Sequence, residues 1–450
     1  MIKKEVQNYV GSLFTTFEEQ LNHKNPLYIL ANTINWEEFE TAFKVHYSEK
    51  MGAPSKPIRR MVGLLILKHI RNLSDESIVD QWEENAYYQY FCGEFLFAQM
   101  RPCSYTELVE FRKRIGKSGM ELIFQESIRI NGKDGEEKES ITDTTVQEKN
   151  ITYPTDAKLH NKIIQKCQQV AEKENIEVRQ SYVRTLKKLK LAQRFRTNPK
   201  NHTKATKADR KIKTIAGRLV RELQRKLEPD NQYSADLQLF ERVLSQKRHD
   251  SNKIYSLHEP NVQCISKGKQ HKKYEFGNKV SIMSTKTTGV IIGALSFEKN
   301  EYDGHTIERA IAQQQQLTGI KLDHTFVDRG YKGLKEVLGT IINTPKIKST
   351  DTKKEKKRLQ KGFRRRAAIE PIIGHLKQDL RLGRNFYKGI VGDQINVLLS
   401  SAAWNFKRML NKWKKNPLIA IFEEYCNSLL EIMGRLSSES NRIIQLMHVS

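Results

Sequence analysis

Cysteine is scarce in this chain, and long apolar runs are missing. The five cysteines among 450 residues are scattered, and no two of them form a C-x-x-C motif. An odd, scattered set disfavours both a disulfide framework and a structural zinc site. The apolar stretch Met61 to Leu67 is far shorter than the roughly 20 residues that a membrane span needs. Since the N-terminal residues also lack the apolar core of a secretory signal, we expect a reduced, cytoplasmic protein.

Acidic residues are too few to balance the basic ones. The chain has 78 Lys and Arg against 52 Asp and Glu, a formal net charge of +26. An excess of this size attracts polyanions, of which nucleic acid is the commonest. Hydrophobic residues still make up 38% of the chain, which is enough for a sizeable core, and the length predicts two or three domains.

Much of the positive charge lies in one segment, residues 184–226, which holds 16 Lys or Arg against two acids, a net +14 in 43 residues. Ile212, Ile215, Leu219 and Leu223 recur there at spacings of three and four, which predicts a helix with one apolar stripe. The apolar stripe argues against a disordered tail, so contact with DNA phosphates is favoured over a merely solvated face. The basic residues expected to bind DNA are Arg210, Lys211, Lys213, Arg218, Arg221 and Arg225.

Changes in hydrophobic periodicity and in turn residues divide the chain into successive segments. Outside the basic block the expected order is β, β, β, α, β, α, β, α, which is typical of a mixed sheet with helices packed against it. The last helix is expected to begin near Arg365 and to run on to about residue 380. The expected segments are a helical N-terminal DNA-binding domain (1–130), a linker with the first core strand (131–157), a helical, strongly basic insertion (158–255), the remainder of the α/β core (256–412) and a C-terminal helical tail (413–450).

Three carboxylates hold notable positions in this pattern. Asp143 follows the first strand, Asp328 ends a later strand just before Gly330, and Glu370 lies in the last helix. Carboxylates at strand ends and on a packing helix can converge, and hard cations such as Mg²⁺ prefer oxygen ligands. Two such metals, about 3.5–4 Å apart, can support phosphoryl transfer. A chain with 52 acids offers many such triples by chance, so surface acids are the alternative interpretation.

At these residues the sequence resembles the DDE transposases of bacterial insertion sequences, in the branch known as insertion sequence family five. The C-terminal signature of that family is Tyr, two residues, Arg, three residues, Glu, six residues, Lys. Arg366, Glu370 and Lys377 fit this spacing, whereas Phe363 stands at the tyrosine position. The second-acid motif Asp-x-Gly-Tyr matches residues 328–331, and the segment TDTTVQEKN around Asp143 resembles the first-acid context.

Further segments resemble the same branch, including NEYDGHTIERA from residue 300 and SDESIVDQWEENAYYQYFCG from residue 74. The resemblance implies an RNase H-like core with a mixed five-stranded sheet, in which Asp143, Asp328 and Glu370 are catalytic and hold two Mg²⁺ ions, with Mn²⁺ able to substitute. It implies that Arg366 and Lys377 contact DNA phosphates. The implied partners are the double-stranded DNA of the terminal inverted repeats and of the target, with a homodimer in the synaptic complex and a nucleoid-associated location.

Two other functions stay open on the sequence alone. One is a non-catalytic DNA-binding protein, such as a decayed transposase or a regulator, and the other is a metal-dependent nuclease that cuts without strand transfer. The retained acids and their flanking basic residues favour a transposase over the first alternative. Only joined DNA products separate it from the second.

Overall fold

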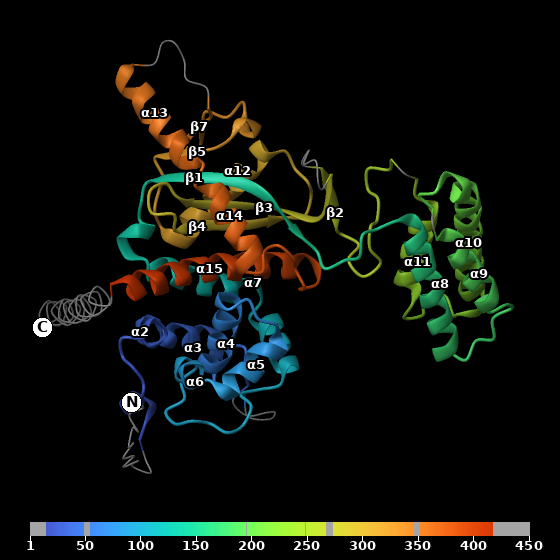
Figure 1. The fold of residues 1–450 in the computed structure, drawn as a ribbon, viewed down its shortest axis with the longest axis horizontal. Coiled ribbons are helices and arrows are strands. Elements are labelled where there is room, and N and C mark those ends of the chain that lie inside the picture. Colours follow the sequence, from blue (N-terminus) through green and yellow to red (C-terminus); the bar gives the residue numbers. More distant parts are fainter. Residues whose placement is uncertain are drawn as a thin grey trace, which may run out of the picture.

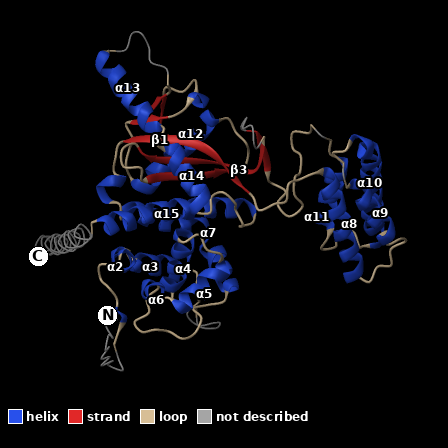
Figure 2. Cartoon of the chain, in the orientation of Figure 1, coloured by secondary structure: helices blue, strands red, loops and turns tan. Residues whose placement is uncertain are grey.

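The computed structural model describes residues 15–48, 55–194, 196–247, 249–266, 273–345 and 352–416. Helices from the first part of the chain lie below a central sheet, and a separate block of helices lies to one side (Figure 1). Figure 2 shows that the strands are confined to the central part and that the other two parts are helical. Within these described ranges, no helix is long and apolar enough to cross a membrane.

The N-terminal part is helical, as expected. The apolar stretch Met61 to Leu67 lies in α4, which α5 follows. The Ser74 hydroxyl caps α5 by accepting a hydrogen bond from the Ser77 amide. A capping box of Ser104 and Glu107 begins α7. The helices are α1 (Phe17–Gln20), α2 (Pro26–Thr33), α3 (Trp36–Lys44), α4 (Ile58–Ile70), α5 (Asp75–Glu84), α6 (Ala86–Phe91) and α7 (Tyr105–Arg129).

The central sheet is mixed, as expected. In the described residues its strands are β1 (Glu139–Glu148), β2 (Gln263–Ser266), β3 (Tyr274–Thr285), β4 (Ile291–Phe297), β5 (His324–Phe326), β6 (Glu336–Val337) and β7 (Thr340–Asn343). The central order is β4-β3-β1-β5-β7, in which β4, β3 and β1 are antiparallel neighbours and β1, β5 and β7 are parallel. The expected count of five strands is too low, because β2 extends the pairing of β3 and β6 pairs with β7.

Strand β6 lies where the sequence pattern suggested a short helix after Asp328. That segment instead forms a 3-10 turn, η2 (Arg329–Tyr331), and then the β6–β7 hairpin. Gly333 and Gly339 have φ values of +100° and +74°. Such values are outside the range of a right-handed helix, so these two glycines divide the segment into turns.

Helices cover the sheet and link it to the N-terminal part. They are α12 (Asp303–Thr318), which packs on β4, then α13 (Lys353–Arg366), α14 (Ile369–Asp379) and α15 (Gly389–Lys415). The helix expected from near Arg365 to about residue 380 is present as α14 but begins four residues later, and the basic run before it forms a separate helix, α13. Pro371 explains the break, because it has no amide hydrogen to donate to the Ala367 carbonyl, which accepts from the Glu370 amide at 3.3 Å instead.

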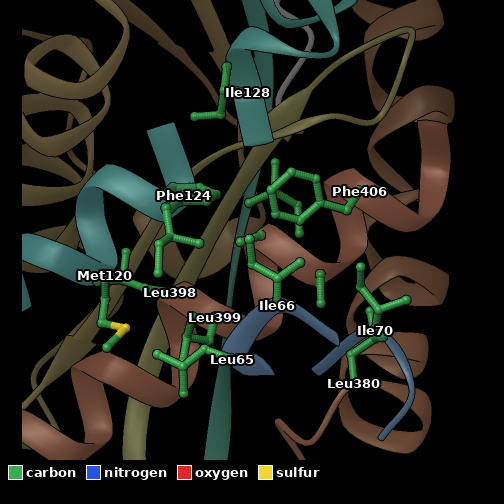
Figure 3. Close-up of a cluster of buried hydrophobic side chains, with 14 of the residues drawn as sticks. Leu65, Ile66, Ile70, Met120, Phe124, Ile128, Leu380, Leu398, Leu399 and Phe406 are labelled. Atoms are coloured by element: carbon green, nitrogen blue, oxygen red, sulfur yellow. The ribbon is translucent and has the colours of Figure 1, made fainter. Parts of the chain in front are cut away.

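Helix α15 lies at the centre of the main hydrophobic core. It packs against α7, α4, α2 and β4. Figure 3 shows Leu398, Leu399 and Phe406 of α15 among Leu65 and Ile66 of α4 and several apolar residues of α7, and all of these belong to one buried cluster that also includes the sheet. The N-terminal helices and the sheet therefore share one continuous core.

The basic block between β1 and β2 has a hydrophobic core of its own. Its helices are α8 (Asp156–Lys173), α9 (Val183–Gln193), α10 (Pro199–Lys226) and α11 (Ser234–Ser245). Ile212, Ile215, Leu219 and Leu223 on α10 are all buried in that core, so the predicted apolar stripe is confirmed. Of the expected C-terminal tail, residues 413–415 belong to α15 and residues 417–450 lie outside the described residues.

Candidate active site

Asp143 and Asp328 lie next to each other at the sheet. Strands β1 and β5 run parallel, and their last paired residues are Ile141 and Phe326. Asp143 lies two residues after Ile141, and Asp328 lies two residues after Phe326. The two aspartates therefore continue the β1–β5 pairing register and lie on the same face of the sheet. Because neighbouring strands are about 4.8 Å apart, the structure brings these two predicted residues together.

The Asp143 carboxylate contacts the end of α13. Its Oδ1 accepts a hydrogen bond from the Thr144 amide at 2.8 Å, and its Oδ2 lies 3.4 Å from Nη2 of Arg366. Both side chains of this ion pair are about four-fifths buried, with exposed fractions of 18% for Arg366 and 19% for Asp143. The Arg366 Nε is buried and has no hydrogen-bond partner in the described part of the chain. The ion pair with Asp143 therefore holds the Arg366 guanidinium beside this aspartate.

Close packing of α13 on β5 holds Arg366 at this position. The ring of Phe363 meets the ring of Phe326 edge to face, with centroids 5.5 Å apart. A side chain on Gly362 would collide with the Phe326 ring, so only glycine allows α13 to approach β5 this closely. Phe363, which stands at the tyrosine position of the family signature, therefore has a packing role that needs no hydroxyl.

Asp328 begins the turn that follows β5. Its backbone is extended, and its Oδ1 accepts a hydrogen bond from the Gly330 amide at 2.8 Å. A Cβ on residue 330 would lie 2.9 Å from Asp328 Oδ1 and 3.0 Å from Asp303 Oδ2. The glycine of the Asp-x-Gly-Tyr motif therefore leaves room for two carboxylates.

Asp303 is a residue that the sequence analysis did not single out. It is the first residue of α12, and its Oδ1 accepts hydrogen bonds from the Thr144 hydroxyl at 2.8 Å and from Nζ of Lys279 at 2.9 Å. Its partners come from β1 and β3, which are far from it in sequence. Only its presence in the segment NEYDGHTIERA, which resembles the family, could have pointed to it.

Tyr331 places a buried hydroxyl among these acids. The side chain is fully buried, and its hydroxyl has no hydrogen-bond partner within the described residues. The nearby Thr306 hydroxyl donates to the Asp303 carbonyl oxygen at 2.6 Å. Burial, followed by the charges of Asp303, Asp143 and Asp328, holds the pKa of Tyr331 well above its ordinary value. The hydroxyl therefore stays protonated and is available to donate a hydrogen bond.

Glu370 lies on α14, which packs against β1. It is exposed beside the buried Ile369, and within the described residues its carboxylate makes no hydrogen bond or ion pair. Lys377 lies two helical turns further on and is half-buried. Among the side chains that the structure describes, no three His, Cys, Asp or Glu are close enough to hold a metal ion. The structure thus joins Asp143 to Asp328 and leaves Glu370 outside that pair, on the helix that covers β1.

The basic residues predicted on α10 lie apart from the aspartates. Helix α10 packs on α8, α9 and α11, and the six predicted side chains are all exposed. Arg210 and Lys213 line a groove of ≈ 640 Å³ together with Arg196, Lys253 and Tyr255, where the block joins the rest of the chain. The structure therefore presents this charge at a separate surface.

Comparison with known proteins assigns the two larger parts. Residues 15–114 match the family described as Transposase domain (DUF772), and residues 246–406 match the Transposase DDE domain. The chain carries a transposase DDE domain. The second match contains Asp328 and Glu370 of this transposase, whereas Asp143 precedes it, because α8 to α11 separate β1 from the other strands.

One curated relative of the transposase is an uncharacterized protein, ORF8 in the nfe locus of Rhizobium meliloti. The two are 40% identical over 173 residues, which cover 37% of the transposase and 83% of the relative. No solved structure matches the chain. The family assignment therefore comes from sequence, and the arrangement of the acids comes from the structure described above.

Proposed function

We propose that this transposase, as a member of the insertion sequence family five branch, binds the terminal inverted repeats of its element, cleaves the DNA there and joins the freed 3′-hydroxyl to target DNA. The observation that carries the proposal is the pair Asp143 and Asp328, which continue adjacent parallel strands in register. Helix α14, with Glu370, packs on the same strand as Asp143. This is an arrangement from which three carboxylates can serve one phosphoryl-transfer centre.

The residues at this centre fit a divalent cation. Carboxylate oxygens are the ligands that Mg²⁺ prefers, and Gly330 leaves space that a side chain would fill. Asp143, Asp328 and Glu370 would hold Mg²⁺, or Mn²⁺ in its place, as a two-metal centre. The bound cations would supply an activated water or 3′-hydroxyl and would stabilise the leaving oxygen.

The basic residues beside the acids position the DNA strand in this proposal. Arg366 is within reach of Asp143 and has a buried Nε that no described group accepts from. A phosphate oxygen would bind the partly exposed guanidinium of Arg366, since guanidinium groups bind phosphate through two donors. Lys377, on the same helix as Glu370, would add a second phosphate contact.

A broader DNA surface would come from α10 and from the N-terminal helices. The exposed α10 residues Arg210, Lys211, Lys213, Arg218, Arg221 and Arg225 form one face of a helix whose other face is buried. Such a face suits the phosphate backbone and carries no sequence information by itself. Recognition of the repeats would then rest on the N-terminal helices, and pairing of two DNA ends on a homodimer.

The experiment that tests the proposal is strand transfer in solution. The full chain is incubated with Mg²⁺, labelled oligonucleotides that carry the element's inverted-repeat ends, and a supercoiled plasmid. The wild type is expected to give labelled plasmid products, whereas Asp143→Asn, Asp328→Asn and Glu370→Gln abolish cleavage and joining but retain DNA binding. Glu301→Gln is the matched control, because Glu301 pairs with Arg309 on the surface of α12.

Three results would contradict the proposal. Cleavage without any joined product would indicate a nuclease, and DNA binding without cleavage by the wild type would indicate a regulator or a decayed transposase. Full activity in all three acid variants would show that the wrong residues were assigned.

A further inference from the structure

Asp303 lies at the proposed centre without belonging to the predicted triad. Its Oδ2 and the Oδ1 of Asp328 are 3.0 and 2.9 Å from the same point, the position of a Cβ on residue 330. These two oxygens therefore lie within about 6 Å of each other beside the glycine. Two carboxylates this close repel each other unless a positive group lies between or beside them.

Only one oxygen of Asp303 is occupied by the described positive and polar groups. Oδ1 accepts from Nζ of Lys279 at 2.9 Å and from the Thr144 hydroxyl at 2.8 Å. No described hydrogen bond or ion pair involves Oδ2. Lys279 thus fixes the orientation of the carboxylate and directs Oδ2 toward Asp328.

A second and independent feature also points to a ligand at this position. The hydroxyl of Tyr331 is fully buried, lacks a hydrogen-bond partner among the described residues and lies in the field of Asp303, Asp143 and Asp328. Leaving a buried hydroxyl unpaired is unfavourable. A group bound between the acids, such as a water on a cation, would pair with it.

We propose that Asp303 is a fourth acidic residue of the cation centre and that its Oδ2, together with the Oδ1 of Asp328, binds a divalent cation. This inference rests on the proposed function and adds a ligand to it. Lys279 neutralises the remaining charge of Asp303, so the residue contributes one oxygen only. Tyr331 donates its hydrogen to an oxygen of the cation's hydration shell.

The test is the binding of Mn²⁺ to the full chain without DNA, followed by the electron paramagnetic resonance signal of free Mn²⁺. Asp303→Asn is expected to weaken Mn²⁺ binding by about tenfold or more, because an amide supplies a neutral oxygen where a carboxylate was. Glu301→Gln removes a charge two residues away, at a side chain that pairs with Arg309, and is expected to bind as the wild type does.

Thr144→Val tests whether Asp303 binds the cation itself or only forms a structural contact with β1. It removes the hydroxyl that donates to Asp303 Oδ1 and leaves Oδ2 untouched. The proposal expects a smaller loss of Mn²⁺ affinity than in Asp303→Asn, because Lys279 still holds Oδ1. A loss in Thr144→Val equal to that in Asp303→Asn, or no loss in Asp303→Asn, would overturn the proposal.

A measurement on the wild type covers the case in which Asp303→Asn does not fold. Fe²⁺ bound in place of Mn²⁺ reacts with added hydrogen peroxide to give Fe³⁺, hydroxide and hydroxyl radicals that cut the backbone nearby, and cuts are expected close to residues 143, 303 and 330. Cuts near 143 and 330 but none near 303 would overturn the proposal. If the wild type bound no Mn²⁺, or if Asp143→Asn and Asp328→Asn left binding unchanged, the proposed function itself would fail.

Discussion

At the scale of single residues, the carboxylates around position 330 explain why a glycine stands there. The point that a Cβ would occupy is 2.9 Å from Asp328 Oδ1 and 3.0 Å from Asp303 Oδ2, closer than carbon and oxygen approach without repulsion. The backbone of Gly330 does not have a positive φ. The requirement for glycine here is therefore steric and comes from the site.

Gly330→Ala tests this steric requirement. We expect the methyl group to push the two carboxylates apart, with a cost of about 1–3 kcal/mol in the free energy of unfolding and a loss of Mg²⁺-dependent cleavage. Urea unfolding and the cleavage assay measure the two effects. Gly374→Ala on α14 is the control, since no atom lies within 4 Å of its Cβ position, and it should stabilise the helix by about 0.5–1 kcal/mol. Unchanged stability and activity in Gly330→Ala would contradict the account.

Asp75 is a residue whose charge holds the N-terminal helices together. Its carboxylate accepts from Arg112 at 2.5 and 2.8 Å and from Lys68 at 2.8 Å. Burial would raise the pKa of Asp75, but the hydrogen bonds and charges of Arg112 and Lys68 outweigh it and lower the pKa to about 2. In the unfolded chain the value is about 3.8, so the ionised carboxylate favours the folded state by about 2 kcal/mol.

This difference predicts a pH dependence with a definite sign. Because the folded pKa is the lower one, the contribution of Asp75 is fully present above about pH 5 and is lost as the pH falls toward 2. The gap in unfolding free energy between the wild type and Asp75→Asn should therefore shrink by about half of that 2 kcal/mol between pH 6 and pH 3. Urea titrations at several pH values measure it. A gap that does not change with pH would exclude this role.

At the scale of elements, the two connections to the basic block are tied to α15 by a buried ion pair network. Lys149, just after β1, lies 3.2 Å from Glu259, just before β2, and 2.7 Å from Asp393 on α15. All three side chains are at least 93% buried. Since Lys149 and Glu259 lie on either side of the block in sequence, this network fixes where α8 to α11 leave the sheet.

Lys149→Met should therefore destabilise the protein strongly. It leaves two buried carboxylates without their cation, and breaking a buried pair in this way costs about 3–5 kcal/mol. Lys188→Met, at an exposed position on α9, is the control and should change the unfolding free energy by less than about 0.5 kcal/mol. Thermal and urea unfolding give both values. Equal stability of the two variants would contradict the role assigned to Lys149.

The helices and strands show which features of the structure could be predicted from the sequence. The mixed sheet and the apolar stripe of α10 follow from local patterns, because burial leaves a signal in consecutive residues. The neighbouring positions of Asp143 and Asp328 do not, since they depend on the pairing of β1 with β5, two strands far apart in the chain. Asp303 could not be found in that way, since its contacts with Thr144 and Lys279 depend on how separate strands meet. The break before Glu370 has a local cause in Pro371, whereas β2 and β6 are too short to leave a periodic pattern.

At the scale of the whole molecule, the transposase carries positive charge on a block with its own core, separate from the acids of the proposed centre. This separation predicts that DNA affinity and chemistry respond to different substitutions. Charge on α10 should set the strength and the salt dependence of binding, while the acids set cleavage.

Replacing Arg210, Arg218 and Arg225 together by Gln tests this prediction. If all three contact phosphates, the slope of log affinity against log salt concentration should fall by about 2.7, since each contact contributes about 0.9. Fluorescence anisotropy with labelled DNA measures the slope. Lys414→Gln with Lys415→Gln, two exposed residues at the end of α15, is the control. An unchanged slope in the triple variant would exclude α10 from the DNA interface.

The central claim is that Asp143, Asp328 and Glu370 meet at one cation centre when DNA is bound. The most direct measurement is an anomalous difference map from crystals of the full chain with its end DNA and Mn²⁺. The account predicts manganese peaks in contact with the carboxylates of Asp143 and Asp328 and with that of Glu370. Manganese bound elsewhere, or a Glu370 carboxylate that makes no contact with that manganese, would contradict it.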